Sequence, residues 1–389
     1  MRRAKLGKNK DRVLLLHEFG PTSRDWHQGQ VVEELRGRGW VVEWAHGRLA
    51  DYQAGGTGLR RLGNLLYCYG TFPWRMVRLR PAAVLVRTAP PGIQLWMSFW
   101  GWVLRVRVVW WLMDYHPEME ARMLEGRQGG AKGAAGLLRW IDRWCLKRTY
   151  AVIAIDEAMA EVVRSRSGKP RVRVYPTWSP GIPADLPARA SHARSRAKEV
   201  RVLHLGNFGF AHDLRGIVAL VERAPADWRF RFWVVNPSER GRLAFAKLGE
   251  HPQVSVQFSP KLSQEDLLAL IDRERIGWGL VPLDPRFGGT VSPSKFHTYL
   301  DLSLPLLYAG PPGTNAWKYC EEYGAGVTIT VPVTKSAISL LCHLQENEEA
   351  GKHMRESVAR AQEAMHCYGP VGLCVMLEEL LNSHPTSST

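Results

Sequence analysis

Hydrophobic positions in the first half of the chain form short continuous runs separated by stretches of helical periodicity. Apolar runs of strand length occupy residues 13–20, 40–47, 83–90, 106–114 and 151–157. Helical patterns run up to residue 39 and cover residues 92–104, 136–149 and 157–166. Continuous rather than alternating apolar runs are typical of strands buried on both faces, hence of a parallel sheet covered by helices. The pattern predicts a doubly wound, Rossmann-like α/β domain over residues 13–178.

A second α/β pattern follows a break in composition. Residues 176–199 are rich in Pro, Ser, Ala and Arg, which predicts an inter-domain linker over 179–199. Strand-like runs then resume at 200–207, 229–235, 254–258, 276–283, 305–310 and 326–331. We expect a second Rossmann-like domain over 200–365, with a C-terminal helix and tail over 366–389 that packs back toward the first domain. Two such domains would face each other across a cleft at the carboxyl ends of their strands.

Charge narrows the choice of partners. The 389 residues carry a formal net charge of +15, which predicts attraction to phosphates on nucleotides, nucleic acid or anionic lipid. Residues 1–12 form a basic tail without a following signal-peptide core, and we interpret them as a solvated tail or a contact for a phospholipid surface. The six cysteines include no Cys-x-x-Cys pair, so a reduced, cytoplasmic setting is expected.

The stretch GGTVSPSKFHTYLDLSLPLLYAG at 288–310 places small residues and one lysine before a helical pattern. Ser292 suits an N-cap and Pro293 the first helical position, which leaves Ser294 and Lys295 in the first turn. A cation there opposes the helix dipole unless it acts together with the free N–H groups on a bound anion. From these residues alone, a capped helix and a phosphate site are equal alternatives.

Four stretches together resemble the GT-B glycosyltransferases, particularly family-4-like members with a Pro-Ser-Lys donor-site motif. The first two are Ser-Pro-Ser-Lys-Phe-x-x-Tyr-Leu at 292–300 and LGNFGFAHDLRGI at 205–217, the latter similar to the first strand, Gly-rich turn and helix of the donor domain. The others are GAGV at 324–327 and MDYHPEM at 113–119, and the match spans about 13–331.

This resemblance implies transfer of a sugar from a nucleotide-sugar to a glycan or lipid-linked acceptor, with retention and without metal or another cofactor. The chain contains no Asp-x-Asp metal motif of the other glycosyltransferase architecture. By the resemblance, the donor diphosphate would meet Arg215 and Lys295, with Lys261 as a third cation. The remaining donor-site candidates are Gly206, Asn207, Ser292, Ser294 and Thr298.

Three positions depart from the family pattern. Threonines, Thr290 and Thr298, stand where many family-4 enzymes have the two glutamates of Glu-x7-Glu, and Asn207 replaces an arginine. A hydroxyl can hydrogen-bond a ribose but supplies no charge. A nucleotide-binding scaffold that has lost catalysis therefore remains an alternative to an enzyme.

In the first domain, Asp114, His116 and Glu118 follow a buried strand. If the segment stays extended, the three side chains point to one side, where they could act as base, bind the sugar or hold a metal. A structural loop in which Asp114 caps the next helix is the competing interpretation. We expect Asp114 to be the base if the reaction inverts, and the group to position the substrates if it retains. His17 and Gly20 lie in the corresponding acceptor-side loop.

The aromatic run at 91–113 is the most unusual composition in the chain. Arg105 and Arg107 interrupt it, which argues against a transmembrane span and for a helix followed by a strand. Trp96, Phe99, Trp100 and Val103 would form the core face of that helix, and Trp102 lies beside it. Two interpretations remain open, an ordinary core helix or a peripheral membrane-facing surface of the first domain. Binding of nucleic acid is not expected, because no recognised motif accompanies the basic charge.

Overall fold

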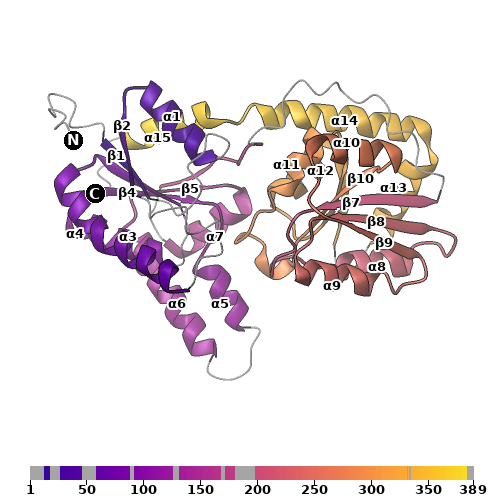
Figure 1. The fold of residues 1–389 in the computed structure, drawn as a ribbon, viewed down its shortest axis with the longest axis horizontal. Helices are drawn as coiled ribbons and strands as arrows, with labels where there is room; N and C mark the ends of the chain where they lie inside the picture. Colours follow the sequence, from indigo (N-terminus) through magenta and orange to yellow (C-terminus); the bar gives the residue numbers. More distant parts are fainter. Residues whose placement is uncertain are drawn as a thin grey trace. The chain divides into compact units, whose positions relative to one another are not determined.

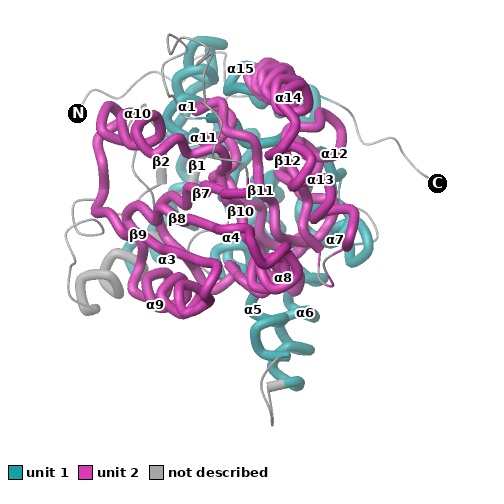
Figure 2. Tube along the Cα trace, turned by 90° about the vertical axis from the view of Figure 1, so that its right-hand side faces the viewer, with its two compact units in different colours: residues 1–180, 368–389 teal, residues 181–367 magenta. Residues whose placement is uncertain are grey.

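The computed structural model describes residues 13–17, 27–45, 58–87, 92–125, 131–167, 171–179, 198–330, 332 and 334–382. The chain divides into two compact units: residues 1–180 with 368–389, and residues 181–367 (Figures 1 and 2). Each unit is built on a parallel sheet of six described strands, flanked by helices. The predicted tail 1–12 lies outside the described residues, as does most of the predicted linker 179–199.

Unit 1 has the strand order β2-β1-β3-β4-β5-β6. Its strands are β1 (Val13–His17), β2 (Val41–Ala45), β3 (Ala83–Arg87), β4 (Arg107–Leu112), β5 (Ala151–Ala154) and β6 (Arg171–Val174). Its helices are α1 (His27–Gly37), α3 (Gly58–Leu79), α4 (Ile93–Val103), α5 (Glu118–Glu125), α6 (Ala131–Leu146), α7 (Glu157–Ser167) and α15 (Pro370–Asn382).

The predicted core face of helix α4 is confirmed only in part, since Trp96 and Trp100 pack partly buried against the core of unit 1. The buried residues of the helix are Ile93, Gln94, Met97, Ser98 and Gly101, whereas Phe99, Trp102 and Val103 are exposed. Gly101 explains which face of α4 packs on the sheet, because a Cβ there would lie 2.3 Å from the Val108 side chain on β4. The helix therefore approaches the sheet closely at Gly101, and part of its aromatic surface faces outward.

The C-terminal helix belongs to unit 1. Helix α15 lies beside α1 (Figure 1), and its buried leucines join the core formed by β1, β3 and β4. Polar contacts reinforce the packing, since Glu378 accepts hydrogen bonds from Arg38 at 3.1 Å and from the Trp40 indole at 2.8 Å. Residues far apart in the sequence thus complete one domain.

Unit 2 has the strand order β12-β11-β10-β7-β8-β9. Its strands are β7 (Glu199–Leu205), β8 (Arg229–Val235), β9 (Val254–Ser259), β10 (Trp278–Pro282), β11 (Leu306–Ala309) and β12 (Gly326–Ile329). Its helices are α8 (Arg215–Arg223), α9 (Glu239–Leu248), α10 (Gln264–Arg273), α11 (Lys295–Asp301), α12 (Asn315–Tyr323), α13 (Lys335–Glu346) and α14 (Glu348–His366).

The strand order in the sheet of unit 2 reverses between β7 and β10. The chain proceeds from β7 to β8 and β9 on one side, and from β10 to β11 and β12 on the other. Such a switch point leaves a crevice at the carboxyl ends of the two central strands, which is where open α/β sheets bind ligands. The segments after β7 (206–214) and after β10 (283–294) border this crevice.

Candidate functional site

Lys295 reaches the switch point of the second sheet from the first residue of α11. Its Nζ atom donates to the backbone carbonyl of Asn207, just after β7, and faces Nε2 of His204 at 3.3 Å and Nε2 of His212 at 3.5 Å. All its described partners are uncharged, and no carboxylate of the described residues forms an ion pair with it. Burial therefore lowers the pKa of Lys295 to about 7.

His212 favours an uncharged lysine. Burial, reinforced by Lys295, lowers the pKa of His212 to about 3 and that of His204 well below its ordinary value, so both rings are neutral. His212 accepts the Gly209 N–H through Nδ1 at 2.9 Å, which places the proton of the neutral ring on Nε2. That N–H points at Lys295, where it can donate to an amine but would repel an ammonium.

Tyr299 ties α11 to the end of β7. Its hydroxyl accepts the N–H of Leu205 at 2.9 Å, and its ring fills the space above Gly279, where a Cβ would lie 2.2 Å from the ring. Helix α11 is thereby held against β7 and β10, with Phe296 and Leu300 also buried on it. The position of Lys295 follows from this packing.

The predicted capping of this helix by Ser292 is wrong. The helix begins at Lys295, and the N-cap position is Ser294, whose side chain makes no capping hydrogen bond. Ser294 has helical backbone angles (φ −82°, ψ −12°), whereas a capping side chain needs an extended backbone at that position. With only seven residues, α11 contributes the placement of Lys295 rather than a long helix dipole.

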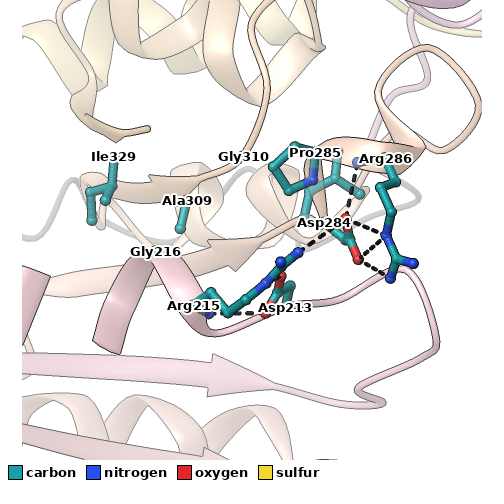
Figure 3. A pocket seen from close by; sticks show the side chains of 10 residues that line it. Asp213, Arg215, Gly216, Asp284, Pro285, Arg286, Ala309, Gly310 and Ile329 are labelled. Atoms are coloured by element: carbon teal, nitrogen blue, oxygen red, sulfur yellow. Dashed lines mark hydrogen bonds and ion pairs between the residues drawn. The ribbon is translucent and has the colours of Figure 1, made fainter. Parts of the chain in front are cut away.

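Arg215 lies apart from Lys295, in a hollow of about 290 Å³ lined by the ends of β10, β11 and β12 and the start of α8 (Figure 3). Its guanidinium pairs with Asp213 and approaches Asp284 at 3.6 Å. Burial alone would raise the pKa of Asp284, but Arg286, which pairs with it at 2.5 Å, helps to hold that pKa below its ordinary value. Two arginines and two aspartates neutralise one another here, so Arg215 offers less free charge to a phosphate than predicted.

The other predicted donor residues lie after β7, on α11 and after β9. Gly206 follows β7 with φ +70°, a conformation that favours glycine, and Asn207 supplies the carbonyl that binds Lys295. Thr298 is partly buried on α11. Lys261 is exposed after β9, which is two strands removed from β7 in the sheet.

The residues preceding Ser292 have structural roles. Thr290 is fully buried and its hydroxyl donates to the Phe287 carbonyl at 2.9 Å, so it closes a turn and is not available to a ribose. Gly288 lies against Pro311, where a Cβ would come within 2.9 Å of the ring. Of this Gly pair, Gly289 has the left-handed backbone, with φ +72°.

The segment after β4 in unit 1 does not stay extended. It turns at His116 and Pro117, and α5 begins at Glu118, so the expectation that the three side chains share one side is wrong. The Glu118 carboxylate is buried and receives Arg122 at 2.8 Å, Arg139 at 3.1 Å and Arg166 at 2.5 Å. Burial alone would raise its pKa, but these hydrogen bonds hold it below the ordinary value, as expected of a structural ion-pair centre.

Asp114 and His116 remain candidates for acceptor chemistry. Burial raises the pKa of Asp114, opposed by His116 and by Arg87 at the end of the neighbouring strand β3. His116 hydrogen-bonds Glu120 of α5 through Nδ1. Arg87 is itself held by Gln28 at 2.6 Å. A carboxyl group with a raised pKa beside a cation is an arrangement suited to binding or deprotonating a hydroxyl.

The acceptor-side loop is outside the described part of the structure. Gly20 is not among the described residues, and His17 ends β1 without a described side chain. Sequence reasoning also missed His204 and His212, which the structure brings to Lys295. The available signal was a lone histidine inside the buried strand that leads to Gly206.

No protein-family model matches the chain, and no curated protein matches it. Solved structures, in contrast, do match the chain. Anabaena HepE in complex with UDP-glucose aligns with a TM-score of 0.58 and 11% identity, covering 96% of this chain and 99% of that chain. The lipopolysaccharide outer core galactosyltransferase WaaB, in its apo form, gives 0.57 and 10%, covering 94% and 99%. A glycosyltransferase from Rickettsia africae gives 0.53 and 11%, covering 96% and 99%.

These similarities establish the fold. The chain has the GT-B fold, with two parallel six-stranded sheets and flanking helices, as in structures of GT-B glycosyltransferases. The predicted fold class is confirmed, whereas membership of family 4 and the Pro-Ser-Lys variant stay predictions. No described helix is long and apolar enough to cross a membrane.

Proposed function

We propose that this protein transfers a sugar from a nucleotide-sugar donor to a glycan or lipid-linked acceptor, without a metal and with retention at the anomeric carbon. One observation carries the proposal: in a GT-B fold, the amine of Lys295 lies at the switch point of the second sheet without a carboxylate partner among the described residues. Similar structures contain UDP or UDP-glucose, which supports a nucleotide-sugar as the donor.

Lys295 would act on the leaving diphosphate. As the bond between the anomeric carbon and the phosphate oxygen breaks, its electron pair stays on that oxygen and negative charge accumulates there. A protonated Lys295 would neutralise this charge, and the anion would in turn favour the protonated lysine. Gly206, the Asn207 backbone, Ser292 and Ser294 would border the phosphates, and Thr298 the ribose. Arg215, which is paired with Asp213, and Lys261, which follows β9, would contribute less positive charge than Lys295.

The acceptor hydroxyl must lose its proton as its oxygen bonds to the anomeric carbon. With retention, the leaving phosphate oxygen accepts that proton, and Asp114 and His116 position the acceptor. With inversion, Asp114 accepts it, and its raised pKa suits a base. Proton NMR of the product anomer distinguishes the two, because only retention preserves the donor's configuration.

A scaffold that binds nucleotide without turnover is the second candidate. The buried turn at Thr290 and the ion pair of Arg215 with Asp213 favour it, since both remove groups that a donor site would use. A thermal-shift screen with UDP, GDP, ADP and CMP derivatives identifies the nucleotide. Release of sugar or product from the matching nucleotide-sugar supports the enzyme, and binding without turnover in the presence of acceptors supports the scaffold.

Lys295→Ala tests the site itself. We expect it to abolish the nucleotide-induced thermal shift and the turnover, while Lys318→Ala, an exposed lysine of α12, leaves both unchanged. Equal nucleotide affinity in Lys295→Ala and the parent protein would remove Lys295 from the donor site.

A further inference from the structure

Three neighbouring helices of unit 1 expose large apolar side chains. Trp74 of α3, Trp102 of α4 and Trp140 of α6 are 58%, 56% and 62% exposed. Leu66, Phe99 and Leu137, one on each of the same helices, are exposed as well. We call these six exposed residues the aromatic face. Tryptophan at such exposure is uncommon, because its large apolar surface is usually buried in a core or an interface.

Helix α4 contacts both α3 and α6, so the exposed residues lie on neighbouring helices of one unit. Trp96 of α4 donates its indole N–H to the Tyr69 carbonyl of α3 at 2.9 Å. Helices α4 and α6 pack together, and Arg148, just after α6, lies over the Trp102 ring at 5.1 Å. Figure 1 shows α3, α4 and α6 next to one another within unit 1.

The exposed charge carried by these helices is positive. Their single carboxylate, Asp142, is buried, whereas Arg78, Arg143 and, just after α6, Lys147 are exposed. Two arginines lie over tryptophan rings: Arg78 over Trp74 at 5.0 Å, and Arg148 over Trp102. An amphipathic indole next to a guanidinium is the combination found where a protein meets the headgroup region of a bilayer.

We propose that the aromatic face docks on a bilayer containing anionic phospholipid. The tryptophans would insert at the boundary between headgroups and acyl chains, and the arginines and lysine would contact the phosphates. A second copy of the chain fits less well, since a two-fold contact would bring cations against cations. This docking is independent of the proposed sugar transfer and of the Lys295 site in unit 2.

Cosedimentation of the full chain with vesicles tests the proposal. Binding to phosphatidylcholine vesicles that contain phosphatidylglycerol is expected to exceed binding to phosphatidylcholine alone and to fall as salt rises. The variant Trp74→Ser/Trp102→Ser/Trp140→Ser should bind at least about tenfold more weakly. Leu243→Ser, a similarly exposed leucine on α9 of unit 2, is the matched control and should bind like the parent.

Folding and self-association are monitored in the same samples. Circular dichroism and thermal melts must match the parent, and if the triple variant does not fold, Trp140→Ser alone takes its place. Arg78→Gln/Lys147→Gln should weaken binding to the anionic vesicles only. Parent-like binding by the folded tryptophan variant would overturn the proposal. So would no binding by the parent, or a parent dimer in light scattering that the tryptophan substitutions dissociate.

Discussion

Nζ of Lys295 lies 3.3 Å from Nε2 of His204, although the two residues are 91 positions apart in the chain. The contact joins the first residue of α11 to the buried end of β7, at the switch point of the second sheet. Burial beside neutral partners leaves the lysine poised between amine and ammonium near pH 7. Its protonation can therefore be coupled to the arrival of an anion.

Replacing Lys295 by Met should weaken nucleotide diphosphate binding by about ten- to a hundredfold, the range expected for loss of a charge-assisted hydrogen bond. The free energy of unfolding should stay the same or rise, because a partly buried charge disappears and the aliphatic chain is kept. Isothermal titration calorimetry and urea unfolding measure the two quantities. A large loss of stability together with the loss of binding would indicate a structural role instead.

The free energy of unfolding should also depend on pH through Lys295. Its folded pKa of about 7 lies below the ordinary 10.5, so between these values the unfolded chain binds a proton that the folded chain lacks. Stability from this group therefore rises with pH across that window, by at most about 1.4 kcal/mol per pH unit, and the gain is lost as pH falls to 7. Lys295→Met should lack this slope when urea unfolding is compared across pH 7 to 10.

His212 should set the pH at which nucleotide binding weakens. His212→Asn keeps an acceptor near Nδ1 for the Gly209 N–H but removes the Nε2 atom that faces Lys295. The pKa of Lys295 should then rise, and the decline of nucleotide affinity with pH should begin at a higher pH than in the parent. His251→Asn is the control, since His251 likewise accepts a backbone N–H, from Gln253 at 3.3 Å, away from Lys295. Identical pH profiles in all three proteins would exclude this role.

Tyr299→Phe should weaken the attachment of α11 to β7, which positions Lys295. The change leaves the Leu205 N–H without its 2.9 Å partner and should cost about 1 kcal/mol of stability. Nucleotide affinity should fall by less than in Lys295→Met, since the amine remains near its position. Urea unfolding and calorimetry on the same preparation check both. Unchanged stability would show that water replaces the hydroxyl.

The fold was predictable because many strands are continuous apolar runs, as in β10 and β11, whose residues are all buried, whereas β6 (RVRV) was not predicted. Helix α9 was not predictable from the sequence, because ERGRLAFAKL has little apolar periodicity and the start of the helix depends on capping by Ser238. Lys295 could be singled out from its motif, but His204 could not, because the contact depends on the packing of α11. The turn after β4 had a signal in Pro117 and was one of the two interpretations of this segment, but the burial of Glu118 among three arginines had no sequence signal.

Glu118→Ala should destabilise the protein rather than impair its chemistry. Removing this carboxylate leaves Arg122, Arg139 and Arg166 without the shared acceptor that binds α5, α6 and α7 together. Loss of one partner from a buried ion pair typically costs about 3 to 5 kcal/mol, and more than one arginine is affected here. Urea unfolding should show this loss, while nucleotide binding by the still-folded fraction, measured at low temperature, should match the parent. Parental stability with abolished sugar transfer would instead return Glu118 to the catalytic candidates.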